Sequence, residues 1–600
     1  MKLRRFWPSA ARPRFTTCVI SRQTLRSLEK QGLIALRSRE EYRISPREYG
    51  VPAEEIALNQ QQQSAYDTIL RQTETGRAGV TLLQGVTGSG KTLVYIRLAQ
   101  TLLEQGKSVM ILVPEIALTP QMMARFTAYF GQKVALLHSG LRLTERWDQY
   151  KRIRRGEATV VLGTRSAVFA PLERLGLIIL DEEQESSYES EKAPCYHARD
   201  IAKYRCVQEG ARLVLGSATP TVETAYYARM GDYGLCRLTE RFNQRRLPQV
   251  ILADMRRELR DGNFSCISRP LRQELERNLA AGEQSILFLN RRGSSRQLLC
   301  PQCGYVPECP RCSVYLTYHS ANDRLMCHYC GYSTEVPKTC PACGSRLMRY
   351  SGVGTQKVEE ALKMRFPTAR ILRMDQDTTM RKDSHQKLLS AFGRGDYDIL
   401  IGTQMVTKGL DFPRVTLVGV LTPDQMLYAD DFRSYERTFS LITQVVGRSG
   451  RRELPGRAFL QSYQPDHPVL TAAARQDYPA FYRTEAESRR LLLYPPFCRL
   501  YCLGFWGSSE AEVKAAGEAT LSLLERLLPA EYPELPVRLL GLAPANVLRV
   551  AGRYRYKLLI KGKNSPRMRE LLWRLYTDPA LSAPMKTVTL TIDPNYDSDL

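Results

Sequence analysis

From Val80 onward, the chain alternates short apolar runs with longer segments in which apolar residues recur at helical spacing. Parallel strands that are buried on both faces have this continuous apolar character, and the helices between them supply the crossovers. One series of predicted strands covers residues 80–84, 108–113, 133–138, 159–164, 175–183 and 213–220, and a second covers residues 285–290, 369–375, 398–404, 415–421 and 457–463. We therefore expect an α/β protein with two parallel-sheet lobes.

The positions of these strands divide the chain into domains. We expect the first lobe at residues 51–235, a linker at 236–270, and the second lobe at 271–299 and 345–480, interrupted by a cysteine-rich insertion at 300–344. In residues 481–600 the pattern predicts strands at 500–506, 537–542, 554–561 and 586–592 and helices at 509–528 and 565–576. This βαββαβ order predicts a C-terminal α+β domain of the ferredoxin-like type.

The first 50 residues contain one predicted helix, at 21–36. Leu25 and Leu28 lie on one face of this helix, Gly32 ends it, and several arginines follow. We interpret residues 1–50 as a partial winged-helix segment. A helical stub is an equally supported alternative, because a complete winged-helix domain needs more chain than this segment offers.

The composition is that of an ordinary globular protein, with 43% hydrophobic and 25% charged residues among 600. No apolar run approaches the roughly 18 residues that cross a bilayer, so we expect no membrane span. The chain has 86 Lys and Arg against 62 Asp and Glu, a net charge of +24, and residues 1–50 alone hold twelve basic residues against four Glu. Such an excess favours a polyanionic partner, with nucleic acid as the first hypothesis.

The strongest local motif is Gly85-Val86-Thr87-Gly88-Ser89-Gly90-Lys91-Thr92, which follows a predicted strand and opens a predicted helix. In this context the pattern predicts a phosphate-binding loop for ATP. Backbone amides and the helix N-terminus would cradle the phosphates. Lys91 would reach the β- and γ-phosphates, and the Thr92 hydroxyl would hold Mg²⁺.

Acidic residues follow another apolar strand of the first lobe, in the sequence Asp181-Glu182-Glu183-Gln184. Phosphoryl transfer needs a metal ligand and a group that orients the attacking water. Asp181 is the expected Mg²⁺ ligand, and Glu182 is the expected general base. A solvated acidic strand end is the simpler alternative, but a phosphate loop about ninety residues upstream favours the catalytic interpretation.

A pair of arginines lies near the end of the second lobe, in Gln444-Val-Val-Gly-Arg448-Ser-Gly-Arg451. A spacing of three places both on one face of a helix. Arg448 and Arg451 are therefore candidate arginine fingers, which stabilise transition-state charge from a second lobe. Hydrolysis would then depend on closure of the lobes. Taken alone, the pair would more readily be an ordinary surface feature.

Eight of the fifteen cysteines form four Cys-x-x-Cys pairs between residues 300 and 343. This spacing predicts two tetrahedral zinc sites of four thiolates each, with an iron–sulfur cluster as the competing metal. Three pairings are possible, and the fourteen residues between the second and third pairs favour a nested one. One site would then contain Cys309, Cys312, Cys327 and Cys330, and the other Cys300, Cys303, Cys340 and Cys343. His319 and His328 are expected to be bystanders.

These motifs carry a resemblance that covers nearly the whole chain. The phosphate loop, the Asp181 motif, Gly216-Ser-Ala-Thr-Pro220 and the Gln444 motif, in this order on two lobes, resemble a superfamily 2 helicase. A narrower set is similar to the PriA-type primosomal replication-restart helicases. This set comprises the eight cysteines and residues 113–120, 163–167, 196–200, 402–405, 408–413 and 494–497.

The resemblance implies an ATP-dependent DNA helicase that moves 3′ to 5′, recognises and remodels stalled or collapsed forks, and initiates primosome assembly and replisome reloading. It also implies the nested zinc pairing and places Gln62 against adenine. Tyr188 and Tyr196 would stack bases, although without the resemblance both are ordinary loop tyrosines. The full implied set is Gln62 and Gln444 for nucleotide binding, and Gln184, Tyr188, Tyr196, Arg199, Ser217, Thr219, Thr403 and Lys408 for coupling and DNA.

The sequence departs from the family pattern in two places. Gln184 stands where the family usually has His, so the polar link to Ser217 and Thr219 is altered, although Gln also donates and accepts hydrogen bonds. Family members also begin with a further domain of about a hundred residues that captures the 3′ end of a nascent strand. We do not find this domain in the sequence, which puts fork-end recognition in doubt.

Partners and location follow from the same observations. We expect single-stranded and forked DNA, single-strand-binding protein and other primosomal or helicase-loading proteins as partners, and no membrane. Thiolates that bind metal indicate a reducing compartment, so we expect a cytoplasmic protein; an arginine-rich organellar transit peptide is the alternative. Two other functions remain open: an RNA helicase or translocase on the same motor, and a primosome scaffold with dispensable ATPase activity.

Overall fold

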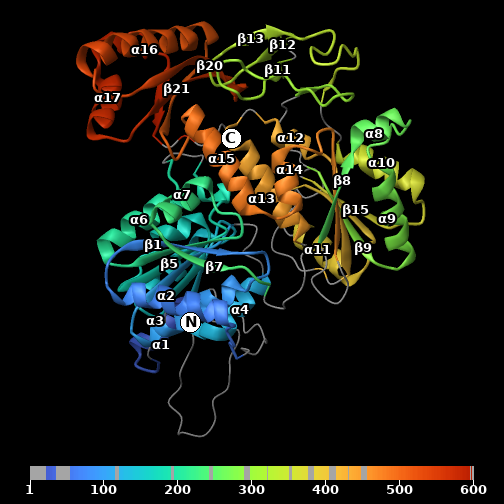
Figure 1. Ribbon diagram of the computed structural model, residues 1–600. Helices are drawn as coiled ribbons and strands as arrows, with labels where there is room; N and C mark the ends of the chain where they lie inside the picture. The colour runs from blue at the N-terminus through green and yellow to red at the C-terminus, as the bar shows by residue number, and fades with distance from the viewer. Residues whose placement is uncertain are drawn as a thin grey trace.

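The computed structural model describes residues 22–34, 55–114, 120–190, 195–241, 248–289, 297–319, 322–350, 354–375, 384–403, 412, 414–429, 431–447, 456–594 and 596. Arg448, Arg451 and Lys408 lie outside these residues, as does most of the predicted winged-helix segment. The described chain forms two sheet-containing lobes, with the cysteine-rich insertion and the C-terminal domain together at one end (Figure 1).

The first lobe is built on a seven-stranded parallel sheet of order β3-β4-β2-β5-β6-β1-β7. The strands are β1 (Gly79–Gly85), β2 (Ser108–Leu112), β3 (Val134–Leu137), β4 (Val160–Gly163), β5 (Leu175–Asp181), β6 (Arg212–Ser217) and β7 (Gly234–Leu238). Its helices are α2 (Gln60–Glu74), α3 (Lys91–Glu104), α4 (Pro120–Phe130), α5 (Leu143–Arg154), α6 (Ala198–Glu209) and α7 (Val222–Met230).

Two separate apolar cores cover the two faces of this sheet. Successive side chains of a strand point to opposite faces. Leu83 and Ile111 therefore pack in one core with Phe126 of α4, whereas their neighbours Leu82 and Met110 pack in the other. Burial on both faces explains the continuous apolar runs in the sequence, and the predicted parallel sheet is confirmed.

The second lobe has a six-stranded parallel sheet of order β15-β16-β9-β17-β18-β8. The strands are β8 (Gln249–Asp254), β9 (Gln284–Phe288), β15 (Ile371–Met374), β16 (Ile399–Gly402), β17 (Val415–Val420) and β18 (Arg457–Ser462). The helices are α8 (Met255–Arg260), α9 (Arg269–Ala280), α10 (Thr355–Arg365), α11 (Ser384–Arg394), α12 (Asp424–Leu427), α13 (Ser434–Val446) and α14 (Pro468–Ala474).

The boundary between the lobes differs from the predicted linker at residues 236–270. β7 pairs with β1 as far as Leu238, and β8 already belongs to the second sheet through its pairing with β18. Each sheet thus gains an edge strand from the segment that we assigned to the linker. In β8 exposed and partly buried residues alternate up to Ala253, as in an edge strand, although residues 250–253 form a continuous apolar run that the predicted linker overlooked.

The cysteine-rich insertion and the C-terminal domain share an apolar core. The insertion contains β10 (Leu298–Leu299), β11 (Thr317–His319), β12 (Arg324–Met326), β13 (Ser333–Glu335) and β14 (Arg349–Tyr350), paired as β10-β14 and β11-β12-β13. Leu316 and Leu325 of the insertion pack in one cluster with Leu500 and Leu559 of the C-terminal sheet. The insertion is therefore anchored on the last domain as well as on the lobe that it interrupts.

The C-terminal domain contains β19 (Arg499–Gly507), α16 (Glu510–Glu531), β20 (Arg538–Val550), β21 (Arg553–Gly562), α17 (Pro566–Thr577) and β22 (Thr589–Asp593). This confirms the predicted βαββαβ order, and the antiparallel sheet has the order β20-β21-β19-β22. The predicted boundary at residue 481 falls inside α15 (Tyr478–Leu492), which packs against α7 and α13. α15 therefore links the C-terminal domain to both lobes.

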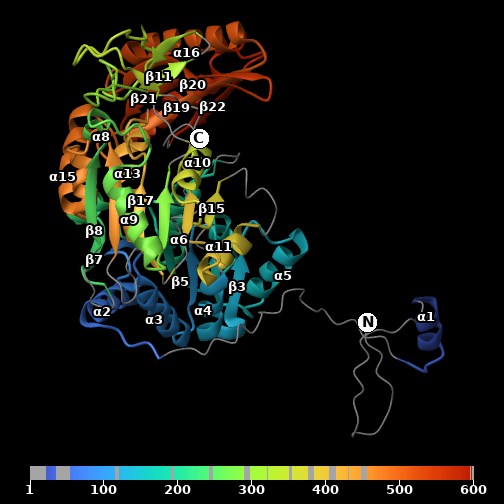
Figure 2. The same ribbon diagram turned by 90° about the vertical axis from the view of Figure 1, so that its right-hand side faces the viewer.

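At the N-terminal end, α1 (Arg22–Lys30) confirms a helix within the predicted 21–36 segment, and Figure 2 shows it apart from the lobes. The winged helix itself stays a prediction. None of the described helices is long and apolar enough to cross a membrane.

Candidate active site

The phosphate loop lies at the carboxyl edge of the first sheet, between β1 and α3. Gly88 and Gly90 have φ values of 82° and 79°, a region that favours glycine. A Cβ at Gly90 would also collide with the side chain of Gln62. The Lys91 ammonium donates to the carbonyl oxygen of Gly85 at 3.0 Å. The loop is therefore held closed by the lysine that is expected to bind phosphate.

Gln62 fastens α2 to this loop. Its side-chain oxygen accepts from the Asn59 amide at 2.9 Å and completes a capping box, while Nε2 donates to the carbonyl oxygen of Ser89 at 2.8 Å. The residue is fully buried. Both ends of the amide thus contact protein groups, and the adenine contact stays a prediction. In this structure Gln62 positions the phosphate loop.

Asp181 ends β5 and lies opposite Gly216 of β6 in the sheet. The Tyr95 hydroxyl of α3 donates to Asp181 Oδ1 at 2.9 Å, in a space that a Cβ at Gly216 would fill. Burial and the neighbouring Glu182 raise the pKa of Asp181 to about 6, although Lys91 and the Tyr95 hydrogen bond oppose the rise. A carboxylate beside a lysine and a phosphate loop suits the predicted Mg²⁺ ligand.

The raised pKa predicts an acid limit for Mg²⁺ binding. Below pH 6 Asp181 takes up a proton and ceases to be a ligand, so the Mg²⁺ concentration that half-saturates ATP hydrolysis should rise about ten-fold per pH unit. Tyr95→Phe removes a hydrogen bond to the carboxylate and should move this limit to higher pH. Titrations of Mg²⁺ between pH 5 and 8 test this; equal Mg²⁺ affinity throughout would contradict it.

Glu182 has a left-handed backbone, with φ of 49°. Such a conformation is strained for a residue other than glycine, asparagine or aspartate, and it persists where surrounding contacts impose it. Here the next amide, that of Glu183, donates to the carbonyl oxygen of Gly216 at 3.1 Å. The turn thus places the Glu182 carboxylate beyond the end of the sheet, next to Asp181.

A chain of hydrogen bonds leads from Glu182 to the second lobe. Gln184 Nε2 donates to Glu182 Oε2 at 2.8 Å, and Gln184 Oε1 accepts from the Ser217 hydroxyl at 2.5 Å. Ser217 Oγ accepts from the Thr219 amide at 2.9 Å, and the Thr219 and Ser440 hydroxyls lie 2.7 Å apart. Gln184 therefore makes the predicted link to Ser217, which continues through Thr219 and ends on α13 of the second lobe.

α13 also brings Gln444 and Gly447, the described part of the arginine motif, against the first lobe. Gln444 Nε2 donates to Glu185 Oε1 of the first lobe at 3.2 Å. A Cβ at Gly447 would lie 2.9 Å from Thr87 Cγ2, so this glycine is in direct contact with the loop. Arg448 follows Gly447 in the sequence. Thr403 comes directly after β16, at the carboxyl edge of the second sheet.

The tyrosines of the predicted aromatic segment have different environments. Tyr188 is fully buried, with its hydroxyl 2.9 Å from the carbonyl oxygen of Leu112 and 2.6 Å from that of Asp181. The predicted base stacking by Tyr188 is therefore wrong in this structure, because the ring packs in the core and the hydroxyl positions the strand end. Tyr196 is partly buried and packs edge-on against Phe169 at 5.0 Å.

Sequence reasoning missed a buried ionic cluster between the lobes. Arg489 of α15 contacts Glu436 at 2.8 Å, Glu485 at 2.8 Å and Glu223 at 3.5 Å, and Arg433 contacts Glu223 at 2.6 Å. Burial raises the pKa of Glu223, but Arg433 and Arg489 outweigh this and bring it to about 2. Glu223 therefore stays charged at neutral pH, and the cluster joins α7 of the first lobe to α13 and α15.

Glu183 and Arg199 form a second missed contact within the first lobe. The buried Glu183 carboxylate accepts from Arg199 Nη1 at 3.2 Å and from the Thr221 amide at 2.7 Å. Arg199 was predicted to act in coupling, but its partner was not. The sequence signal that could have pointed to Glu183 is that it directly follows Glu182, the expected general base.

The eight cysteines form two groups with the predicted nested membership: Cys300, Cys303, Cys340 and Cys343 in one, and Cys309, Cys312, Cys327 and Cys330 in the other. Sulfur atoms 3.7 Å apart in Cys300–Cys343 and Cys309–Cys330 match the separation of about 3.8 Å that tetrahedral Zn–S bonds of about 2.3 Å give. Four thiolates per group fit zinc, and all eight cysteines would hold the two ions in closed structural sites. Neither His319 nor His328 belongs to a group.

The two metal groups differ in burial, which predicts unequal costs of losing a ligand. Cys327 is fully buried in the core shared with the C-terminal domain, whereas Cys343 is exposed. Cys327→Ser should therefore lower the thermal stability of the C-terminal half more than Cys343→Ser, and chelation should reproduce the larger effect. ATP hydrolysis should survive in part. Equal losses of stability, or ATP hydrolysis lost in step with zinc, would contradict this account.

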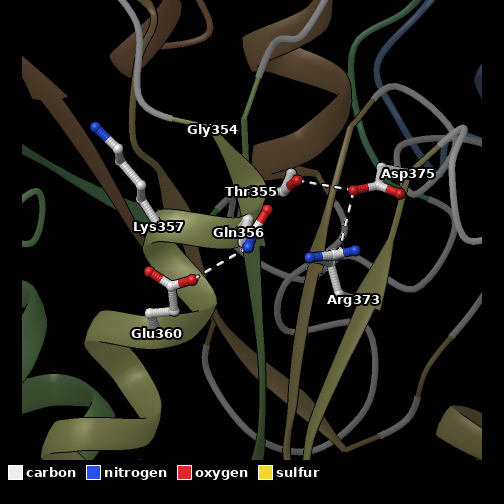
Figure 3. A pocket seen from close by; sticks show the side chains of 7 residues that line it. All are labelled: Gly354, Thr355, Gln356, Lys357, Glu360, Arg373 and Asp375. Carbon is white, nitrogen blue, oxygen red and sulfur yellow. Dashed lines mark hydrogen bonds and ion pairs between the residues drawn. The ribbon is translucent and has the colours of Figure 1, made fainter.

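A separate hollow of about 400 Å³ lies on the second lobe. Figure 3 shows several of its polar groups paired with one another, including Thr355 with Asp375 at 2.8 Å and Gln356 with Glu360 at 3.2 Å. None of the predicted site residues lines it. The lining residues are Gly354, Thr355, Gln356, Lys357, Glu360, Arg373 and Asp375.

Four family matches cover the parts of this architecture in order. Residues 59–226 match the DEAD/DEAH box helicase family and residues 352–453 the helicase conserved C-terminal domain. Residues 309–334 match the PriA DNA helicase Cys-rich region, and residues 490–595 the primosomal protein N C-terminal domain. With its phosphate loop, acidic motif and two parallel-sheet lobes, the chain is an ATP-dependent DNA helicase of superfamily 2.

Curated relatives narrow the assignment. The chain is 45% identical over 576 residues to replication restart protein PriA of Bacillus subtilis. These aligned residues cover 96% of this chain and 71% of the relative. It is 45% identical to the PriA of Synechocystis, and the match covers 90% of this chain and 65% of that relative. It is 39% identical to the PriA of Chlamydia pneumoniae, and that match covers 91% of this chain and 73% of the relative. The chain belongs to the PriA family of replication restart proteins.

Proposed function

We propose that this PriA-family helicase moves 3′ to 5′ along single-stranded DNA, recognises and remodels stalled or collapsed replication forks, and initiates primosome assembly and replisome reloading. The observation that supports a working motor is the hydrogen-bonded path from Glu182 through Gln184, Ser217 and Thr219 to Ser440. A motor must tie hydrolysis to relative movement of its lobes. This path joins the proposed general base to the second lobe.

In the proposed mechanism the phosphate loop and the acidic motif act together on ATP. Backbone amides of residues 85–90 and the N-terminus of α3 hold the phosphates, and Lys91 leaves the Gly85 carbonyl to reach the β- and γ-phosphates. Asp181 and the Thr92 hydroxyl would hold Mg²⁺, which would supply positive charge to neutralise the phosphates. Glu182 orients the attacking water and accepts its proton.

The arginines complete this mechanism from the second lobe. Arg448 directly follows Gly447, which contacts the phosphate loop. We assign Arg448 and Arg451 as arginine fingers and Gln444 as a residue of the nucleotide site. Because these groups come from α13 and the residues after it, hydrolysis requires the lobes to close.

DNA would run across the carboxyl edges of both sheets. Tyr196 and Arg199 in the first lobe and Thr403 and Lys408 in the second lobe are the proposed contacts. Partners beyond DNA would be single-strand-binding protein and primosomal or helicase-loading proteins, which we assign to the zinc insertion and the C-terminal domain. The site of action would be the cytoplasm.

Steady-state ATP hydrolysis tests the proposal. The purified chain is assayed alone, with single-stranded DNA, with a forked duplex that carries a 3′ end at the junction, and with RNA of equal length. We expect the fork to stimulate most. Stronger stimulation by RNA would overturn the DNA assignment, and no stimulation by any nucleic acid would favour a scaffold. Stimulation by single strands alone would contradict the proposed fork recognition but would still support a DNA-dependent motor.

A further inference from the structure

The last strand of the first lobe ends directly beside the phosphate loop. β7 pairs with β1 at the edge of the sheet, and Leu238 at its end is the partner of Gly85. The Val86 amide donates to the carbonyl oxygen of Leu238 at 3.1 Å. Residues 239–241, which follow β7, therefore start next to the residues with which the loop begins.

α2 holds this segment in place. The helix packs against β7 (Figure 1). Gln61 Oε1 accepts from the Thr239 amide at 2.8 Å, and Gln61 Nε2 donates to the Thr239 hydroxyl at 2.9 Å. The next residue of α2, Gln62, binds the loop itself through the carbonyl oxygen of Ser89. One end of a helix thus fixes both the phosphate loop and the segment that carries Arg241.

Arg241 is buried against the phosphate loop. The residue is 6% exposed, whereas Glu240, directly before it, is exposed to solvent. A Cβ at Gly88 would lie 3.9 Å from Arg241 Cγ, so the aliphatic part of the side chain passes close to this glycine. Arginine is rarely buried to this extent unless an anion pairs with it. The anion that a phosphate loop binds is the triphosphate of a nucleotide.

Several donor atoms beside the loop are buried without using their hydrogen-bonding capacity. Arg241 has other interactions in the protein, but its Nε and Nη2 are buried and make no hydrogen bond to the described residues. These two atoms form one edge of the planar guanidinium, which can donate to two oxygens of a phosphate at once. The buried Ser89 hydroxyl likewise makes no hydrogen bond to the described residues. Buried donors usually have acceptors, and phosphate oxygens would supply them.

The charges at the loop favour a polyanion. Lys91 of α3 is buried, and its ammonium donates to the carbonyl oxygen of Gly85. Arg241 brings a second buried cation to the same loop from the segment after β7. Two buried cations repel each other, whereas a triphosphate attracts both. The arrangement therefore favours a ligand with several phosphates over an uncharged nucleoside.

We propose that Arg241 binds a phosphate of ATP and complements Lys91 as a second cation of the first lobe. The inference rests on the proposed nucleotide site at residues 85–92. It separates Arg241 from the proposed fingers Arg448 and Arg451, which come from the second lobe and act when the lobes close. Arg241 belongs to the same lobe as the loop, so its contact needs no closure. It should therefore strengthen nucleotide binding itself.

Equilibrium binding of ATP to the full chain without DNA tests the proposal. Arg241→Met keeps most of the aliphatic part of the side chain near Gly88 and removes the charge. This variant should bind ATP about ten- to hundred-fold more weakly, the range for a hydrogen bond to a charged group. Steady-state hydrolysis should show the same loss in KM, with kcat changed by less than about three-fold. Arg237→Met removes an equal charge from an exposed position of β7 and should bind ATP like the parent.

Tripolyphosphate, used as a second ligand, separates a phosphate contact from a contact with the base. This ion has phosphates but no base, so Arg241→Met should weaken its competition with a fluorescent nucleotide by the same factor as that of ATP. Unchanged ATP binding, a loss for ATP alone, or a loss of kcat without a loss of binding would overturn the inference.

Two further variants keep the test decisive. Arg241→Lys keeps the positive charge but not the planar pair of donors, so it should bind ATP more tightly than Arg241→Met and more weakly than the parent. It carries the test if circular dichroism shows that Arg241→Met does not fold, and parent-like ATP binding would then overturn the inference. Lys91→Ala should lose binding of both ligands. If it bound both like the parent, the proposed site at the loop would be wrong, and the inference with it.

Discussion

Glu182→Gln is expected to lower kcat for ATP hydrolysis by about 10²- to 10⁴-fold while nucleotide binding is retained. The substitution keeps the size and the hydrogen-bonding capacity of the side chain but removes the group that accepts a proton from water. Gln184 Nε2 lies 2.8 Å from Glu182 Oε2 and would still find an acceptor in the new amide. The measurement is single-turnover hydrolysis together with equilibrium binding of a fluorescent nucleotide.

The matched control for this substitution is Glu104→Gln. Glu104 is exposed at the end of α3, so its replacement changes the net charge equally without touching the site. This variant should hydrolyse ATP at the parent rate. A Glu182→Gln chain with a kcat within about three-fold of the parent would exclude Glu182 as the base, and loss of nucleotide binding would assign it a structural role instead.

Arg489→Met is expected to reduce the free energy of unfolding by about 3–5 kcal/mol. The side chain of Arg489 is 2% exposed, and it contacts the carboxylates of Glu436, Glu485 and Glu223. Removing the guanidinium leaves three buried acids with too little positive charge. Because Glu223 belongs to the first lobe and Glu436 to the second, the loss should also loosen the contact between the lobes. Equilibrium denaturation monitored by circular dichroism measures the change.

Arg490→Met supplies the control, because Arg490 is the next residue of α15 and is exposed. A surface substitution of this kind usually changes stability by less than about 0.5 kcal/mol. Equal stability of the two variants would show that the buried cluster contributes little. A Glu485→Gln change in the Arg489→Met background should recover part of the loss, since it removes one of the unpaired acids.

The residues that sequence alone placed well belong to contiguous motifs. Gly85 to Thr92 form a loop in which Gly88 and Gly90 adopt the left-handed conformations that the pattern requires, and Asp181 ends a strand beside it. The zinc groups followed from cysteine spacing, because a tetrahedral site with four thiolates allows few arrangements of four short pairs. The residues of the phosphate loop are neighbours in sequence as well as in space. For the cysteines, the chemistry of zinc binding restricts the possible pairings.

The remaining features depend on contacts between distant segments. Tyr188 is buried because its hydroxyl reaches Leu112, 76 residues away, and nothing in the local pattern distinguishes it from a surface tyrosine. Arg489 and Glu223 are 266 residues apart and meet only when α15 packs against both lobes. The contact of Gln62 with Ser89, 27 residues away, is likewise absent from the local pattern, and its adenine contact stays a prediction.

Strand displacement tests most directly the proposed 3′ to 5′ DNA motor driven by ATP. Two partial duplexes of identical sequence carry a single-stranded tail at the 3′ end or at the 5′ end of the long strand. We predict ATP-dependent displacement from the 3′-tailed substrate, little from the 5′-tailed one, and none from either with the Lys91→Ala chain. Preference for the 5′ tail would contradict the direction, and no ATP-dependent displacement from either substrate would contradict the motor itself.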